Sequence, residues 1–134
     1  MKHVVFDSYA LIALFREEKG FEFVLELLVQ ISKGEITGSM SVINLGEIYY
    51  MISRKSNSEN ADQAVKAVLQ FPLTIINADF ALTMEAAKLK SRFKLSYADA
   101  FAAAITISLK ATLITGDREF ANLEKEKEFN CHFI

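Results

Sequence analysis

The chain has 134 residues, of which 51% are hydrophobic and 24% charged, and its formal net charge is −2. This length suits one hydrophobic core, so we expect residues 1–134 to form a single domain. The acidic balance argues against broad, charge-driven binding of nucleic acid, although it permits a local basic rim around an acidic pocket. Cys131 is the only cysteine, which leaves no disulfide framework and no cysteine metal site.

Hydropathy predicts no membrane-spanning segment. No apolar run reaches the ~18 residues that a membrane span needs. Asp7 also interrupts the first apolar stretch too early for a signal peptide. We therefore expect a cytoplasmic protein with no membrane partner.

The first half of the chain alternates short apolar runs with amphipathic segments. Residues 4–6 predict a strand that ends at Asp7, and helices are expected over residues 9–18 and 21–31. Residues 36–40 predict a second strand. Ser41 is suited to cap a third helix that runs to about Ile52. The polar stretch 55–60 predicts a loop.

The second half repeats this alternation. A helical stripe covers 61–69, a strand is expected over 73–76, and Asp79 can cap the next helix. Ser96 then begins a helix that closes at Lys110. Asp99 lies three residues after Ser96, which is a capping-box arrangement. This helix is apolar on nearly all sides, which indicates burial. A strand over 113–115 follows, and 131–134 could form a last one.

Strands that alternate with helices predict an α/β fold with a mostly parallel central sheet. Ligands of such sheets bind outside the carboxyl ends of the strands. Asp7 and Asp117 each follow a predicted strand, and Glu47 and Asp99 lie early in helices that begin at the same edge. We therefore expect these four carboxylates, from four separate segments, to converge.

Each carboxylate also has an ordinary explanation. Asp99 suits a helix N-terminus, and Asp7 and Asp117 suit turns after strands, whereas Glu47 lies in an otherwise apolar helix. Four gathered like charges raise the energy of the folded chain unless a cation lies among them. Mg²⁺ or Mn²⁺ prefers such oxygen ligands, and His3 and His132 have no spacing that suggests zinc.

Four segments then point to a known family: VVFDSYALIALF, SVINLGEIYY, LSYADAFAAA and LITGDREF. They resemble the signature segments of PIN-domain ribonucleases, in particular the VapC-like toxins of toxin–antitoxin pairs. The resemblance runs from Met1 to about Phe120. Matched residue by residue, the family's acidic quartet falls on Asp7, Glu47, Asp99 and Asp117. The hydroxyl that precedes the last acid falls on Thr115, and a small polar position falls on Ser8.

The resemblance implies a three-layer α/β/α sandwich and Mg²⁺- or Mn²⁺-dependent endoribonuclease activity. It also implies a homodimer that a cognate antitoxin neutralises, and we expect the antitoxin to place a basic side chain into the acidic rim. Some members of this family bind RNA or protein without cleavage. A catalytically silent PIN-fold binding module is therefore the alternative.

Roles can be assigned within the expected site. Asp7 and Asp99 come from rigid ends of core elements and are the expected direct metal ligands. Glu47 and Asp117 would complete the metal site. Thr115 would orient a ligand or water. Arg118 and Lys94 are the nearest basic candidates for phosphate contacts, although both could be solvated surface charges. A phosphatase or receiver domain with Asp7 as phosphoacceptor is disfavoured, because no second aspartate accompanies the first strand.

Overall fold

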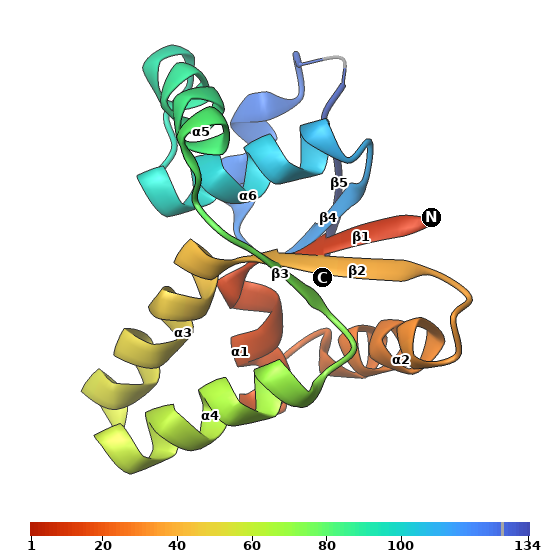
Figure 1. Ribbon diagram of the computed structural model, residues 1–134, viewed down its shortest axis with the longest axis vertical. Helices are drawn as coiled ribbons and strands as arrows, with labels where there is room; N and C mark the ends of the chain where they lie inside the picture. The colour runs from red at the N-terminus through yellow and green to blue at the C-terminus, as the bar shows by residue number, and fades with distance from the viewer. Residues whose placement is uncertain (127) are drawn as a thin grey trace.

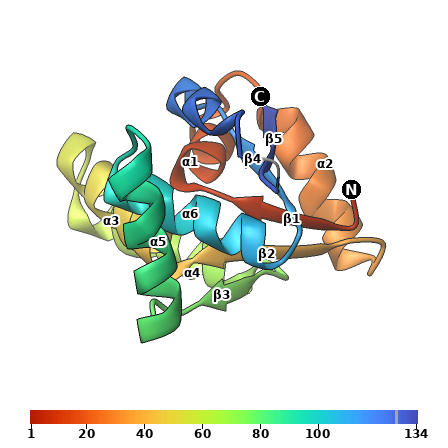
Figure 2. The ribbon, with the colours of Figure 1, turned by 90° about the horizontal axis from the view of Figure 1, so that it is seen from above.

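The computed structural model describes residues 1–126 and 128–134. Within them a five-stranded sheet has the order β3-β2-β1-β4-β5, and every neighbouring pair is parallel. The strands are β1 (His3–Phe6), β2 (Thr37–Ser41), β3 (Thr74–Ile76), β4 (Thr112–Thr115) and β5 (Asn130–Phe133). The predicted parallel sheet is therefore confirmed, and the first strand of the chain lies at its centre (Figure 2).

Helices cover both faces of this sheet (Figure 1). One face packs against α1 (Ser8–Arg16), α2 (Phe21–Ser32), α3 (Val42–Lys55) and α4 (Ser58–Gln70). The other packs against α5 (Phe80–Arg92), α6 (Tyr97–Ser108) and the short 3-10 helix η1 (Arg118–Leu123). This arrangement is the expected three-layer α/β/α sandwich.

The central strand divides the core in two. Successive side chains of a strand point to opposite faces. Val4 and Phe6 accordingly belong to the apolar cluster under α1–α4, and Val5 belongs to the cluster under α5 and α6. All three are buried, so β1 cannot shift without disrupting both layers.

Three helix starts form as the sequence predicts. The side chains of Ser41, Asp79 and Ser96 accept hydrogen bonds from backbone N–H groups two or three residues later, at 2.9–3.1 Å. Each bond satisfies a donor that the first helical turn would otherwise leave free. These caps fix where α3, α5 and α6 begin, and two of these helices carry acids of the site.

Two helix boundaries show how the structure departs from the expectation. Asn57 caps α4 through the Asn60 N–H at 2.8 Å, and α3 extends to Lys55, so only residues 56 and 57 of the expected 55–60 loop lie outside helices. α1 ends at Arg16 because Glu17 takes a left-handed conformation with φ 53°, three residues before Gly20. In the described part of the chain, no helix is long and apolar enough to cross a membrane.

Candidate active site

The site is built at the carboxyl edge of the sheet, beginning with Asp7. This residue follows β1 directly and caps α1: its Oδ1 accepts a hydrogen bond from the Ala10 N–H at 2.9 Å. The Thr115 hydroxyl, at the end of β4, donates to Asp7 Oδ2. Asp7 is buried. One of its carboxylate oxygens is held by the first turn of α1 and the other by the end of β4.

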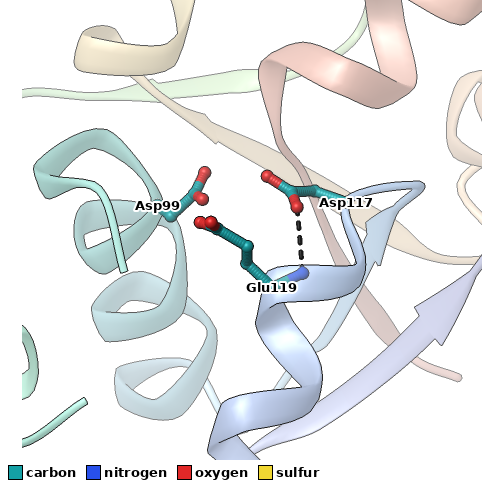
Figure 3. A group of neighbouring side chains, drawn as sticks. All are labelled: Asp99, Asp117 and Glu119. Carbon is teal, nitrogen blue, oxygen red and sulfur yellow. Dashed lines mark hydrogen bonds between the residues drawn. The ribbon is translucent and has the colours of Figure 1, made fainter. Parts of the chain in front are cut away.

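Asp117 follows β4 by one residue and begins η1. Its backbone N–H donates to Thr115 Oγ1 at 3.0 Å, so one hydroxyl links Asp7 to Asp117. The carboxylate of Asp117 accepts from the Glu119 N–H at 3.0 Å and thereby caps η1 (Figure 3).

Asp99 lies in the first turn of α6 and faces these residues across the edge (Figure 3). Ser96 Oγ accepts from the Asp99 N–H, which forms one half of the expected capping box. The Asp99 side chain instead turns toward Asp117 and Glu119. Ligand atoms of these three carboxylates all lie within 4.8 Å of one another.

Three donors surround the carboxylate of Glu47. Its Oε1 accepts from Ser8 Oγ at 2.9 Å and from Asn44 Nδ2 at 2.8 Å, and its Oε2 lies 3.5 Å from the Tyr50 hydroxyl. Ser8 therefore orients Glu47 and ties α1 to α3. The family resemblance predicted a small polar residue at this position, and its structural role is the hydrogen bond to Glu47.

One cavity of about 350 Å³ connects the predicted acids. Its lining comprises the whole predicted quartet together with Glu119 and neighbouring side chains, namely Asp7, Ser8, Tyr9, Glu47, Met51, Ser96, Asp99, Asp117 and Glu119. None of these described lining residues is Lys or Arg. The convergence expected from the sheet topology is therefore present in the structure.

Burial and mutual repulsion raise two of the carboxyl pKa values. The pKa of Asp7 rises to about 7, mainly because burial disfavours its charged form, while the Thr115 and Ala10 hydrogen bonds act in the opposite direction. The pKa of Asp99 rises to about 8, again through burial first and then through the charge of Asp117. A bound cation would relieve both effects.

The donor set fits a hard divalent cation. Carboxylate oxygens converge from three elements, and a hydroxyl orients one of them, which suits Mg²⁺ or Mn²⁺ better than a softer metal. Asp99, Asp117 and Glu119 are close enough to share one ion, with Asp7 and Glu47 lining the same cavity. In the described residues, His3 and His132 take no part in this cluster.

The two basic candidates do not line this cavity. The Arg118 guanidinium lies 4.6 Å from the centroid of the Phe133 ring on β5. Lys94 is exposed, and its backbone carbonyl accepts from Asn122 Nδ2 at 3.1 Å. Their role as phosphate contacts stays a prediction.

Sequence reasoning missed two residues, Glu119 in the acidic cluster and Asn44 beside Glu47. Glu119 reaches the acidic cluster only because η1 turns the chain back after Asp117. So short a helix has no apolar periodicity from which it could be predicted. Asn44 is completely buried beside Glu47, three residues before it on the same helix face. The signal for Asn44 was present, since an amide in an apolar helix needs a polar partner.

The sequence matches the PIN domain family over residues 4–126. The chain therefore belongs to the PIN domain family, as its four acidic segments indicated. No curated protein matches the sequence significantly.

Solved structures share the fold at low sequence identity. The chain is 20% identical to one in VapBC2 of Rickettsia felis bound to a promoter DNA fragment, with a TM-score of 0.74 and 98% of each chain covered. A DNA-bound VapBC from Salmonella typhimurium gives 14% identity and a TM-score of 0.74, covering 99% of this chain and 98% of that one. VapC20 of Mycobacterium tuberculosis, a sarcin–ricin loop cleaving toxin, gives 15% and 0.72, covering 90% and 95%.

Proposed function

We propose that this protein is a metal-dependent endoribonuclease that hydrolyses RNA phosphodiester bonds at the acidic cavity. The observation that carries the proposal is the approach of the Asp99, Asp117 and Glu119 ligand atoms to within 4.8 Å of one another. Asp7 and Glu47 line the same cavity, so five carboxylates share it. Membership of the PIN domain family supports the same activity.

The proposed cofactor is Mg²⁺ or Mn²⁺, held by Asp99, Asp117 and Glu119 together with Asp7, and Glu47 lines the same cavity. Such an ion, when bound, supplies a water that deprotonates near neutral pH and relief of charge on the phosphate. The chain's own residues keep the carboxylates in place. Thr115 restrains Asp7, and Ser8 and Asn44 restrain Glu47, so the ligands do not have to be ordered when the ion arrives.

The test is cleavage of RNA by the purified protein with Mg²⁺, with Mn²⁺ and with EDTA. Cleavage should require the ion and fall by orders of magnitude in Asp117→Asn. Asp79→Asn is a matched control, because Asp79 caps α5 outside the cavity and asparagine caps equally well. RNA binding without cleavage under every metal condition would favour the catalytically silent module instead.

We further propose that the protein is the toxin of a toxin–antitoxin pair in the cytoplasm. Two of the similar structures are VapBC complexes and a third is described as a cleaving toxin. The cavity wall described above contains acids and no Lys or Arg, so a basic antitoxin side chain could enter it. The neighbouring reading frame should encode a small DNA-binding protein, and adding that protein should stop cleavage. A complex that left the acidic cavity open would contradict this mode of inhibition.

A homodimer is also proposed. Large apolar side chains are exposed on α2, at Leu25 and Val29, and on α5, where Phe80 is 83% exposed. A second copy could cover such side chains. Light scattering should give twice the 15.1 kDa chain mass. A mass of one chain at micromolar concentration would count against the dimer.

A further inference from the structure

Another cavity, of about 530 Å³, lies among three of the helices that cover one face of the sheet. α3 and α4 lie side by side, and α1 adjoins α3 (Figure 1). Each helix contributes one stripe of the lining: residues 15 and 16 of α1, residues 52, 55 and 56 at the end of α3, and residues 60, 63, 64 and 67 of α4. In the described part of the chain, this cavity shares no lining residue with the acidic cavity.

The charge of this cavity is opposite to that of the acidic one. Arg16 and Lys55 line it, and none of its described lining residues is Asp or Glu. Both residues are exposed, and neither forms a salt bridge within residues 1–126 and 128–134. The whole chain has a net charge of −2, so two such cations at one cavity are a local departure from its acidic balance. They suit an anionic ligand, because a guanidinium and an ammonium both bind phosphate.

The remaining lining has an apolar side. It comprises Phe15, Ile52, Ala64 and Ala67, of which Ala64 is buried and the others are half-buried. The Phe15 ring packs against the Phe71 ring, with 6.3 Å between the ring centroids and 19° between the ring planes. Phe15 is therefore already held in place. A flat apolar group can pack on this side without the cost of ordering it first.

Two amides complete the lining. Asn60 and Gln63 are exposed on one face of α4, and each amide offers both donors and an acceptor. Asn60 Nδ2 donates to the Ser56 hydroxyl, which orients this amide at the turn between α3 and α4. Such amides suit the polar edge of a nucleobase, which also presents donors and acceptors together.

The two cations also have an ordinary explanation. Arg16 and Lys55 each lie in the last turn of a helix, where the helix dipole favours a positive charge. Arg54 lies in the same turn of α3, but its guanidinium lies 5.1 Å from the centroid of the Tyr50 ring and does not line the cavity. The dipole thus accounts for basic residues at helix ends. It does not account for two of them at one cavity that has no acid in its described lining.

We propose that this cavity binds a nucleotide, with the phosphate on Arg16 and Lys55 and the base on the apolar side beside Phe15. A simple anion would use only the two cations, and an apolar ligand would leave them unused. A nucleotide carries a doubly charged phosphate, a flat ring and a polar ring edge in one molecule. The volume of 530 Å³ also lies within the roughly 300–1,000 Å³ of small-molecule sites.

This site stands apart from the proposed nuclease centre. Arg16 lies eight residues after Ser8 on α1, and Lys55 lies eight residues after Glu47 on α3. Eight helical residues span about 12 Å. A nucleotide on the two cations would therefore be bound beyond the carboxylates, and its binding should require no metal ion.

The test is calorimetric titration of the purified protein with AMP in EDTA, so that no metal can bridge the phosphate to the acidic cavity. AMP should bind with a Kd of about 1 mM or below, and adenosine and inorganic phosphate should each bind about 10-fold more weakly or worse. Arg16→Gln and Lys55→Gln should each weaken AMP binding by about 3- to 30-fold. Arg54→Gln is the matched control: it removes the same charge from the same helical turn as Lys55→Gln and should bind AMP like the parent.

Ala67→Leu tests the volume of the cavity without changing any charge. Leucine is a good helix former, and Ala67 is half-buried at the lining, so α4 should still form while the added carbon atoms occupy the cavity. AMP affinity should fall by about 10-fold or more, with both cations still in place. Binding like that of the parent would show that AMP does not occupy this cavity and would overturn the proposal.

The parent protein and the charge variants can also overturn the proposal. A Kd for AMP above about 10 mM in the parent would do so. Equal losses in Lys55→Gln and Arg54→Gln would reduce the cations to helix-end charges. Tighter binding of tetraglutamate than of AMP would assign the cavity to an acidic peptide instead.

A 5′-phosphorylated oligoadenylate distinguishes the two sources of such a ligand. If it binds more tightly than AMP and loses affinity in Lys55→Gln, the ligand is the terminal nucleotide of an RNA strand. If it binds no more tightly than AMP, and AMP binding depends on Lys55, the ligand is a free nucleotide. Both results support nucleotide binding at this cavity, and neither depends on metal-dependent cleavage.

Discussion

The Thr115 hydroxyl donates a hydrogen bond to Oδ2 of Asp7, a residue 108 positions earlier in the chain. Oγ1 of Thr115 also accepts a hydrogen bond from the Asp117 N–H, so Thr115 joins the ends of two neighbouring strands at the site. The bond also lowers the pKa of Asp7 against the effect of burial. One buried hydroxyl thereby holds a proposed metal ligand in place and favours its charged form.

Thr115→Val should therefore impair the site more than the fold. Loss of the hydroxyl leaves buried polar groups without a partner, which costs about 1–3 kcal/mol of stability. The pKa of Asp7 should rise further, and affinity for Mn²⁺ should fall by roughly 10- to 100-fold. Metal titration by calorimetry measures the affinity, and Thr115→Ser, which keeps the hydroxyl, is the control. Unchanged Mn²⁺ affinity in the valine variant would show that this bond is not needed.

The stability of the metal-free protein should decrease with rising pH. The folded-state pKa values of Asp7 and Asp99, about 7 and about 8, lie above their ordinary value of 3.8. Between about pH 4 and 8 the folded chain therefore binds more protons than the unfolded chain, so raising the pH favours unfolding, by a few kcal/mol in order of magnitude. Urea unfolding in EDTA at pH 5 and pH 8 measures the effect. Equal or greater stability at pH 8 would contradict it.

Asp99→Asn separates the metal site from the fold. Asparagine keeps the size of the side chain, and the cap of α6 uses the backbone N–H of residue 99, so packing changes little. Removal of a crowded charge should leave the metal-free variant as stable as the parent or slightly more so. Mn²⁺ at about 10-fold over its Kd should stabilise the parent by about 1.4 kcal/mol, a shift of a few degrees in Tm.

The variant should lose most of that metal-induced shift. If Asp99 served only the helix dipole and its cap, the substitution would cost about 0.5–2 kcal/mol with or without metal. A variant destabilised in EDTA, beside a parent whose melting ignores Mg²⁺ and Mn²⁺, would therefore refute the metal site.

Glu119→Gln tests the residue that only the structure brought forward. If its carboxylate holds the ion with Asp99 and Asp117, the variant should bind Mn²⁺ more weakly while its metal-free Tm stays near that of the parent, because Glu119 is exposed. Glu124→Gln, another exposed glutamate nearby, is the control. Equal Mn²⁺ affinity in both variants would place Glu119 outside the metal site.

The sequence predicted most of the sheet, and the meeting of the four acids at its carboxyl edge, because the elements that carry them are specified by short-range signals. Ser41, Asp79 and Ser96 cap helices through bonds within three residues, and Asp7 and Asp117 follow apolar runs. Parallel topology then dictates that such strand ends meet.

Features that depend on tertiary packing could not be predicted in this way. The 3-10 helix that delivers Glu119 is stabilised by burial of Phe120 and Leu123 against α5 and α6, which no local pattern reveals. The direction of the Arg118 side chain likewise follows from Phe133, a residue of the distant strand β5. Each depends on a partner far away in sequence.

The central place of β1 has a consequence for synthesis of the chain. β1 is made first, yet β4, which flanks it and leads to Asp117, comes from the last quarter of the sequence (Figure 2). A ribosome-bound chain that ends before residue 112 leaves one edge of β1 unpaired and lacks both Thr115 and Asp117. Because chains emerge from the N-terminus, the acidic site cannot be assembled before residues 112–117 have left the ribosome. The order of the strands therefore delays the proposed nuclease until the ribosome has added β4 and Asp117.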